Sequence, residues 1–429
     1  MREQIEALAA SVHQYRLSNG LQIILHEDHA LPQVALHTFW RVGSRNESPG
    51  ATGLAHFIEH LMFNGGKNYG PNQFDEIMEA NGGANNAFTN QNITVYQNSF
   101  PATALSTVFD LEADRMAGLL LERNSFVAER KVIAAERRST VESDNFELMN
   151  EKLWATAFEV HPYRWPVIGW PQDIQRWRLA DLREFYRCYY TPNNAVMVLT
   201  GDLDGDETLR MCEHYFGGLA SRPVPVRALP VEPPQTAPRR ADVRLPAHLP
   251  AFTCGYRTPA SRHPDHFALH LLEIILVAGQ SSRLYRRLVD GERLATWVRS
   301  DYGPSLDPGL FILTAQCNPG HTAAECEEVL AQELQRLRDE PVSAAELRKA
   351  QNICRAAFVR SLTTLASKAD TLGAFAVYFD DYRQLFDALE HYAALTAADL
   401  QAAANAWLNP NQGTMVTLHP EPQEALEER

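Results

Sequence analysis

The chain of 429 residues lacks the features that mark several large classes of protein. It has only six cysteines and no CxxC pair, so neither a disulfide scaffold nor a cysteine-based zinc cluster is indicated. No apolar run approaches the ~20 residues that span a bilayer, and no continuous apolar stretch of a secretion signal follows the first charges. No phosphate-cradling glycine loop precedes a helix, which argues against a nucleotide enzyme.

The charge balance narrows the choice of partners. The 39 basic residues are outnumbered by 53 acidic ones, giving a net charge of −14, so nucleic acid and anionic membrane surfaces are poor partners. Hydrophobic residues make up 45% and charged residues 21% of the chain, as in ordinary globular proteins. We therefore expect a soluble protein without a signal peptide. The compartment stays open, cytoplasmic or, if a signal has been removed, periplasmic.

The order of elements favours a duplicated α+β unit. A chain of this length usually exceeds one hydrophobic core, and a proline-rich stretch separates two halves that each mix strands with helices. We predict an N-terminal domain at 1–218, an extended linker at 219–250 and a C-terminal domain at 251–429. An Asn-Gly pair predicts a type I′ hairpin turn between the first two strands. The predicted strands are 15–17, 21–25, 33–42, 84–88, 94–98, 195–200, 251–256, 297–302 and 310–318. The predicted helical segments are 54–63, 102–121, 125–158, 264–277, 281–288, 323–337 and 344–361.

The segment His56-Phe57-Ile58-Glu59-His60 carries the chemistry. Residues four apart share one face of a helix, about 6 Å from each other, so His56 and His60 can present two imidazoles to one ion. Glu59 lies near the same face, beside that ion. The neighbouring residues are apolar, and polar groups in a buried helix are costly unless they are paired or bound to a metal. A chance motif on a surface helix is the alternative.

A catalytic zinc needs a third protein ligand and one open position for water. Glu129 and Glu136 lie seven residues apart on one helical face, separated by about 10 Å along the axis. Both carboxylates are therefore not expected to bind one ion. One is the candidate ligand, and the other can accept the free N–H of a ligating histidine.

With these motifs in view, the sequence resembles the pitrilysin/insulinase family of zinc peptidases, most closely its short-chain branch that includes mitochondrial processing peptidase. The resemblance covers nearly the whole chain and rests on the hairpin and on GLAHFIEHLMFNGG, ERKVIAAE, HPYRWPVIGW, YYTPNNAVMVLTGDLD and SSRLYRRL. It implies two similar α+β domains, each resembling an α/β sandwich, that close like a clamshell. It also implies one zinc ion per chain held by His56, His60 and Glu136, Glu59 as the general base, and Glu129 as the acid behind a ligand.

The resemblance also implies a peptide-binding edge strand. The residues that match it are Ala84, Asn85, Asn86, Ala87 and Phe88. Main-chain hydrogen bonds along such an edge bind a peptide with little demand on its sequence. A glycine- and asparagine-rich surface turn is the alternative interpretation. Tyr96 and Phe57 either line the site or belong to the core.

One departure from the family pattern concerns an Arg/Tyr pair in the second half, which helps hold the substrate and the oxyanion in self-sufficient members. Our alignment places Val289 and Thr296 at these positions. A slip in the alignment would instead select Arg287, Arg293 or Tyr302.

We therefore expect a zinc metalloendopeptidase that cleaves peptides or unfolded segments and needs a second subunit of the same fold, in a heterodimer, to supply the pair. A homodimer is the alternative assembly. A non-catalytic structural subunit and a peptide-binding or metal-storage module are the alternative functions. In the second half, His266 and His270 also lie four apart, but no glutamate accompanies them in the motif.

Overall fold

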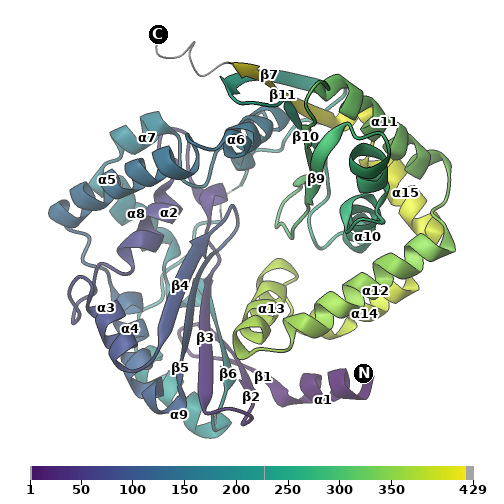
Figure 1. The fold of residues 1–429 in the computed structure, drawn as a ribbon. Helices are drawn as coiled ribbons and strands as arrows, with labels where there is room; N and C mark the ends of the chain where they lie inside the picture. Colours follow the sequence, from purple (N-terminus) through teal and green to yellow (C-terminus); the bar gives the residue numbers. More distant parts are fainter. Residues whose placement is uncertain (1, 227, 422–429) are drawn as a thin grey trace. The chain divides into compact units, whose positions relative to one another are not determined.

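The computed structural model describes residues 2–226 and 228–421, and the chain divides into two compact units (Figure 1). Unit 1 is formed by Met1–Glu136, Trp165–Leu229 and Val359–Asp387. Unit 2 is formed by Arg137–Arg164, Pro230–Phe358 and Ala388–Arg429. Each unit combines one mixed sheet with helices, which confirms the α+β class.

The sheet of unit 1 has six strands in the order β1-β2-β6-β3-β5-β4. Strands β2 and β6 are parallel and the other neighbours are antiparallel. Strand β4 therefore lies at one edge. The strands are β1 (Val12–Arg16), β2 (Gln22–Glu27), β3 (Gln33–Trp40), β4 (Ala84–Thr89), β5 (Thr94–Pro101) and β6 (Ala195–Gly201).

Helices surround this sheet, and the two that matter for the site are α2 and α5. Helix α2 connects β3 to β4 and contacts both β4 and β5. Helix α5 begins in unit 1 and ends four residues beyond its boundary. The helical elements are α1 (Arg2–Ser11), η1 (Ser44–Asn46), α2 (Leu54–Leu61), α3 (Gln73–Ala80), η2 (Ala102–Ala104), α4 (Leu105–Ala117), α5 (Arg123–Thr140), α7 (Pro171–Arg176), α8 (Leu179–Tyr189), η4 (Pro192–Asn194), α9 (Gly205–Phe216) and α13 (Leu365–Tyr378).

The sheet of unit 2 has five strands in the order β7-β11-β8-β10-β9. Strands β7 and β11 are parallel, and the other neighbours are antiparallel. The strands are β7 (Arg239–Pro246), β8 (Ala251–Arg257), β9 (Ala295–Asp301), β10 (Leu310–Cys317) and β11 (Gly413–Glu421). The helical elements are α6 (Asn145–Ala157), η3 (Pro162–Arg164), α10 (Asp265–Val277), the π-helical η5 (Tyr285–Gly291), α11 (Ala323–Asp339), α12 (Ala344–Ser361), α14 (Gln384–Ala394), α15 (Ala397–Trp407) and η6 (Pro410–Gln412).

The two sheets repeat one topology. Numbered along the chain from β2, the strands of unit 1 follow the order β2-β6-β3-β5-β4, and those of unit 2 follow the equivalent order β7-β11-β8-β10-β9. The single parallel pair also lies at the same place in both. This correspondence confirms the two similar domains that the order of elements predicted. It makes α10, between β8 and β9, the topological counterpart of α2.

Each unit includes one helix from the other side of the proline-rich stretch. Helix α13 packs on β3 and β6, where the ring of Phe39 meets the backbone of Gly373 and leaves no room for a Cβ. Helix α6 packs on β7, β8 and β11. The compact units thus differ from the contiguous division at 218 and 250 by these two helices, and that division stays a prediction.

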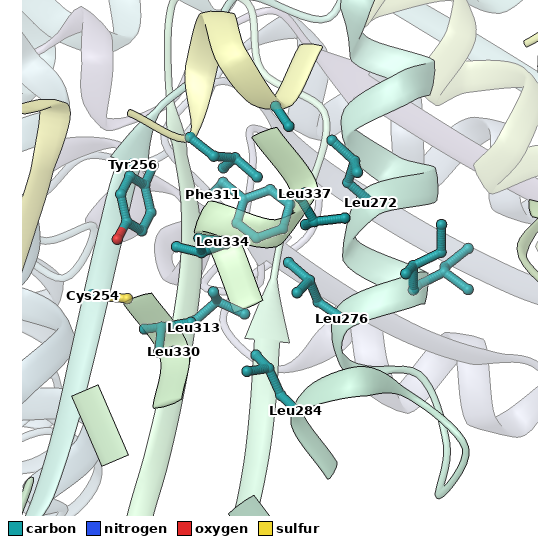
Figure 2. Packing of buried hydrophobic residues seen from close by; sticks show 14 of the residues in the cluster. Cys254, Tyr256, Leu272, Leu276, Leu284, Phe311, Leu313, Leu330, Leu334 and Leu337 are labelled. Carbon is teal, nitrogen blue, oxygen red and sulfur yellow. The ribbon is translucent and has the colours of Figure 1, made fainter. Parts of the chain in front are cut away.

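The side chains along strand β10 of unit 2 point alternately to the two faces of the sheet, and helices cover both faces. Phe311, Leu313 and Ala315 face α10, α11 and α15, whereas Leu310 and Ile312 face α6. Figure 2 shows leucines from α10 and α11 around Phe311 in the first of these clusters. Because successive side chains of a strand point to opposite faces, this sheet needs a helical layer on each side.

Two local predictions were wrong. A single helix at 125–158 is instead two, because the side chain of Asp144 accepts the amide hydrogens of Phe146 and Glu147 and caps a new helix. The hairpin turn is not type I′, because only Gly20 of the Asn-Gly pair has a positive φ, 90°. Within the predicted linker lies strand β7, which a proline permits because β7 is at the sheet edge and ends at Pro246.

Candidate metal centre

Helix α2 presents a polar stripe opposite a buried apolar one. Leu54, Phe57, Ile58 and Leu61 are at most 3% exposed and fix the helix against the core of unit 1. The remaining face carries His56, Glu59 and His60, all partly buried. The packing of the apolar stripe therefore determines where the three polar side chains point.

The structure brings His56, His60 and Glu136 together, with ligand atoms within 4.8 Å of one another. The two Nε2 atoms lie 3.3 Å apart. Glu136, from α5, places Oε1 3.6 Å from His56 Nε2 and Oε2 3.4 Å from His60 Nε2. Among the described residues this is the one group of three or more His, Cys, Asp or Glu side chains that is this close.

These separations suit a zinc ion. Zinc bonds to nitrogen and oxygen are about 2.0–2.2 Å long, and a tetrahedral arrangement then puts donor atoms roughly 3.3–3.6 Å apart. The separations of 3.3, 3.4 and 3.6 Å fall within this interval. Two imidazoles and a carboxylate are also an established donor set for catalytic zinc. The residues present therefore fit the metal.

Glu129 is the acid that contacts a ligating histidine instead of the ion, one of the two roles between which the residue spacing left Glu129 and Glu136 open. Its Oε1 lies 2.9 Å from Nδ1 of His60, and its Oε2 accepts a 2.8 Å hydrogen bond from the Asn64 side chain. A carboxylate on Nδ1 fixes the ring so that Nε2 faces Glu136. Asn64 is not singled out by the sequence, because an Asn-Gly-Gly segment directly after a predicted helix is typical of a helix end.

The two histidines differ in their protonation. Burial would lower the pKa of His60, but its hydrogen bonds to Glu129 and Glu136 outweigh this effect and raise it to about 9. Burial and the neighbouring His60 lower the pKa of His56 to about 4. The pKa values of the two imidazoles are thus shifted in opposite directions, and a divalent cation bound at Nε2 of His60 would replace a proton there.

Glu59 lies beside the cluster rather than within it. Burial raises the pKa of this carboxyl above its usual value, although a hydrogen bond to Thr89 opposes the shift. Its Oε2 is buried and has no hydrogen-bond partner among the described residues. A desolvated carboxyl with a raised pKa is suited to accept and return a proton near neutral pH.

The predicted peptide-binding residues lie on β4, at the edge of the sheet. Their exposure alternates, with Ala84, Asn86 and Phe88 more exposed than Asn85 and Ala87. Among the residues that the structure describes, this strand pairs only with β5, so its other edge carries main-chain groups without a ladder partner there. Phe57 and Tyr96 are at most 1% exposed and belong to the core.

The positions aligned with the Arg/Tyr pair lie in unit 2. Val289 packs against the core cluster, and the hydroxyl of Thr296 donates to the carbonyl of Gln316 at 3.2 Å. Two of the residues that an alignment slip would select are engaged elsewhere. Arg287 binds Glu292 and the fully buried Glu333, and the hydroxyl of Tyr302 lies 2.9 Å from Nδ1 of His266.

Comparison with known proteins agrees with these observations. Residues 22–169 match the family described as "Insulinase (Peptidase family M16)", and residues 176–354 match "Peptidase M16 inactive domain". "Zinc protease PqqE" of Helicobacter pylori is 33% identical over 94% of this chain and 92% of its own length. An "uncharacterized zinc protease", Rv2782c of Mycobacterium tuberculosis, is 27% identical over 96% of this chain and 94% of that protein.

Solved structures show the same similarity. The crystal structure of a protease from Helicobacter pylori has a TM-score of 0.90 and 32% identity, covering 95% of this chain and 99% of that one. A peptidase M16 inactive domain from Pseudomonas fluorescens has a TM-score of 0.85 at 19% identity, covering 96% and 98%, and shares the fold. Among the described residues, no helix combines the length and apolar character needed to cross a membrane.

Proposed function

The chain belongs to the insulinase family of peptidases, family M16, and on that premise we propose that it is a zinc metalloendopeptidase acting on peptides or unfolded protein segments. The observation that supports this function best is the convergence of three ligand atoms from α2 and α5 at the separations that zinc requires. The neighbouring acid Glu59 adds a general base to these ligands.

In this proposal His56, His60 and Glu136 hold one zinc ion, and Glu129 with Asn64 orients His60. When bound, zinc would lower the pKa of a water molecule and polarise a peptide carbonyl. Glu59 accepts the proton of the attacking water at its carboxylate and then donates it to the leaving amine. Its burial supports both steps, because desolvation raises the pKa of the Glu59 carboxyl above its usual value and makes it a stronger base.

We propose that the substrate binds along β4 as an added strand. Residues 84–88 offer unpaired main-chain groups at the edge of the sheet, and the strand carries mostly small side chains. Strand β4 also contacts α2, which carries Glu59, and Thr89 at its end bonds to that carboxyl. A peptide bond held on this edge would lie beside the acid. Main-chain recognition explains why an extended, unfolded segment would be preferred.

We further propose that a second subunit of the same fold supplies the Arg/Tyr pair. Support comes from unit 2, where Val289 and Thr296 occupy the aligned positions and where Arg287 and Tyr302 are held by Glu333 and His266. A homodimer with another donor is the alternative assembly. Full peptidase activity of strictly monomeric protein, measured beside sedimentation analysis, would contradict both forms of this proposal.

The function is tested by Glu59→Gln. The amide cannot accept the proton of water, so we expect kcat to fall by about 100-fold or more while one zinc per chain is retained. Hydrolysis of a flexible peptide and zinc content by atomic emission give the two measurements. Retained turnover would remove Glu59 from its role. Zinc without any wild-type hydrolysis, alone or with a partner, would favour the non-catalytic subunit.

A further inference from the structure

The N-terminus of α2 is held by a residue outside the helix. Its N-cap residue, Gly53, has a φ of 90° and no side chain to cap the first amides. Instead Glu47, 1% exposed, accepts the amide hydrogens of Gly53 and Ala55, each at 2.8 Å. The first amides of a helix have no partner within it. Here the carboxyl group of Glu47, which lies six residues before Gly53 and eight before Ala55, supplies the acceptors for both amides.

The preceding residue, Thr52, is fixed from a second segment. Asp173, itself 5% exposed, accepts the Thr52 hydroxyl at 2.7 Å and its amide at 3.3 Å. The indole N–H of Trp177 donates to the Thr52 carbonyl at 2.8 Å. The Trp177 ring also stacks on Phe57, with centroids 4.8 Å apart. The start of α2 is therefore bonded on several sides at once.

Two glycines let these segments touch through their backbones. A Cβ on Gly169 would lie 2.5 Å from the Thr52 carbonyl oxygen, and one on Gly53 would lie 2.5 Å from that of Ile168. Both glycines have φ near +90°, a conformation that L side chains rarely adopt. This contact explains the Val-Ile-Gly-Trp end of one of the motifs that carried the resemblance.

We propose that Glu47 is a positioning residue of the metal centre and acts through the first turn of α2. Ala55, whose amide Glu47 holds, directly precedes His56, and α2 has only eight residues. A small rotation or shift of so short a helix would move both imidazoles relative to Glu136 on α5 and change the separations of 3.6 and 3.4 Å from its carboxylate. Burying a carboxyl group is costly, and burial raises the pKa of Glu47 well above its usual value, whereas a serine or aspartate at the N-cap would satisfy the same amides locally.

The inference rests on the proposed zinc function, and Glu47→Gln tests it. The variant keeps the volume but replaces one of the two acceptor oxygens by an N–H₂ group, so one of the two amides loses its acceptor. We expect zinc to bind about 10- to 100-fold more weakly, as for other residues that orient metal ligands. We also expect kcat to fall while KM changes by less than about 3-fold. Zinc affinity is measured by competition with a chromophoric chelator, and far-UV circular dichroism checks the fold.

Glu333→Gln is the matched control, because Glu333 is a fully buried carboxylate in unit 2 that binds Arg287 and Arg336. It should lower the melting temperature and leave zinc affinity unchanged. If Glu47→Gln fails to fold, Thr52→Val is the second test of the inference. This variant removes the hydroxyl that donates to Asp173 and should also weaken zinc binding. Wild-type zinc affinity and kcat in the folded variants would overturn the inference. Wild-type protein that binds no zinc would overturn the function itself.

Discussion

Helices α2 and α10 occupy equivalent places in the two sheets, and both carry the sequence His-Phe-x-x-His. In α2, Nε2 of both histidines faces a carboxylate of another helix, and Nδ1 of His60 binds a second carboxylate. In α10, Nδ1 of His266 meets the hydroxyl of Tyr302 at 2.9 Å, and Nδ1 of His270 meets that of Tyr392 at 2.6 Å. The same spacing thus gives one candidate metal centre and one pair of histidines that are hydrogen-bonded to tyrosines.

The difference lies in what surrounds each pair. The fourth residue of this five-residue motif is Glu59 in α2 and the fully buried Leu269 in α10. A carboxylate on the outer nitrogen strengthens an imidazole as a ligand, whereas a tyrosine hydroxyl carries no charge. Burial also lowers the pKa of His266 to about 4. Two histidines one turn apart therefore do not make a metal site without acids from a second element.

The largest predicted effect, on zinc content, should distinguish α2 from α10. His60→Ala removes one of the three proposed ligands, so we expect zinc content to fall from one per chain to nearly none after dialysis against a weak chelator. His270→Ala should leave zinc content at one per chain, because the ring contacts the Tyr392 hydroxyl and a single carboxylate, Glu273 at 4.0 Å, and belongs to no cluster of three ligand groups among the described residues. Atomic emission on both purified variants gives the answer. A loss of zinc in His270→Ala would break the comparison.

The next effect concerns pH. The pKa of His60, about 9 without metal, means that the ring is protonated below pH 9 and that zinc must displace this proton. Zinc affinity should therefore fall as pH decreases, by about 10-fold per unit and about 100-fold from pH 8 to pH 6. Calorimetry in buffers of different ionisation enthalpy should report about one proton released. Affinity that is independent of pH in this range would contradict the charged state of His60.

Glu129→Gln should have a smaller effect. The amide can still hold the His60 ring but no longer offers a negative charge to Nδ1, so zinc affinity should fall by about 10-fold. The pH dependence should also flatten, because the hydrogen bond to Glu129 is one cause of the raised pKa of His60. Chelator competition at pH 6 and pH 8 measures both. An unchanged pH profile would assign the raised pKa to Glu136 alone.

The smallest effect is on the stability of unit 2. Burial raises the pKa of Glu273, on α10, to about 7, so the folded state binds a proton that the unfolded state releases near pH 4.5. The stabilisation from that proton is present below pH 4.5 and is lost as pH rises through 7. Glu273→Gln stays neutral and should gain about 2 kcal/mol over the wild type at pH 8 and much less at pH 5. Urea unfolding at both pH values tests this, and equal differences would refute it.

Sequence reasoning succeeded where chemistry follows local periodicity. The spacing within α2 put His56 and His60 on one face, and the spacing within α5 left one acid to bind and one to orient, as Glu136 and Glu129 now lie. It failed where packing brings distant segments together. Nothing in the pattern around Glu47 indicates that it caps a helix beginning seven residues later. The placements of α6 and α13 likewise follow from tertiary contacts that no local signal encodes.

The placement of these two helices determines how the polypeptide can be divided. Cutting the gene near residue 229 would yield two fragments. The first would lack α13, so its strands β3 and β6 would expose apolar surface. The second would lack α6, so one face of its sheet would be uncovered. Neither fragment is expected to remain in solution alone. Produced together, each would provide the helix that completes the other, so activity regained on mixing would report their assembly.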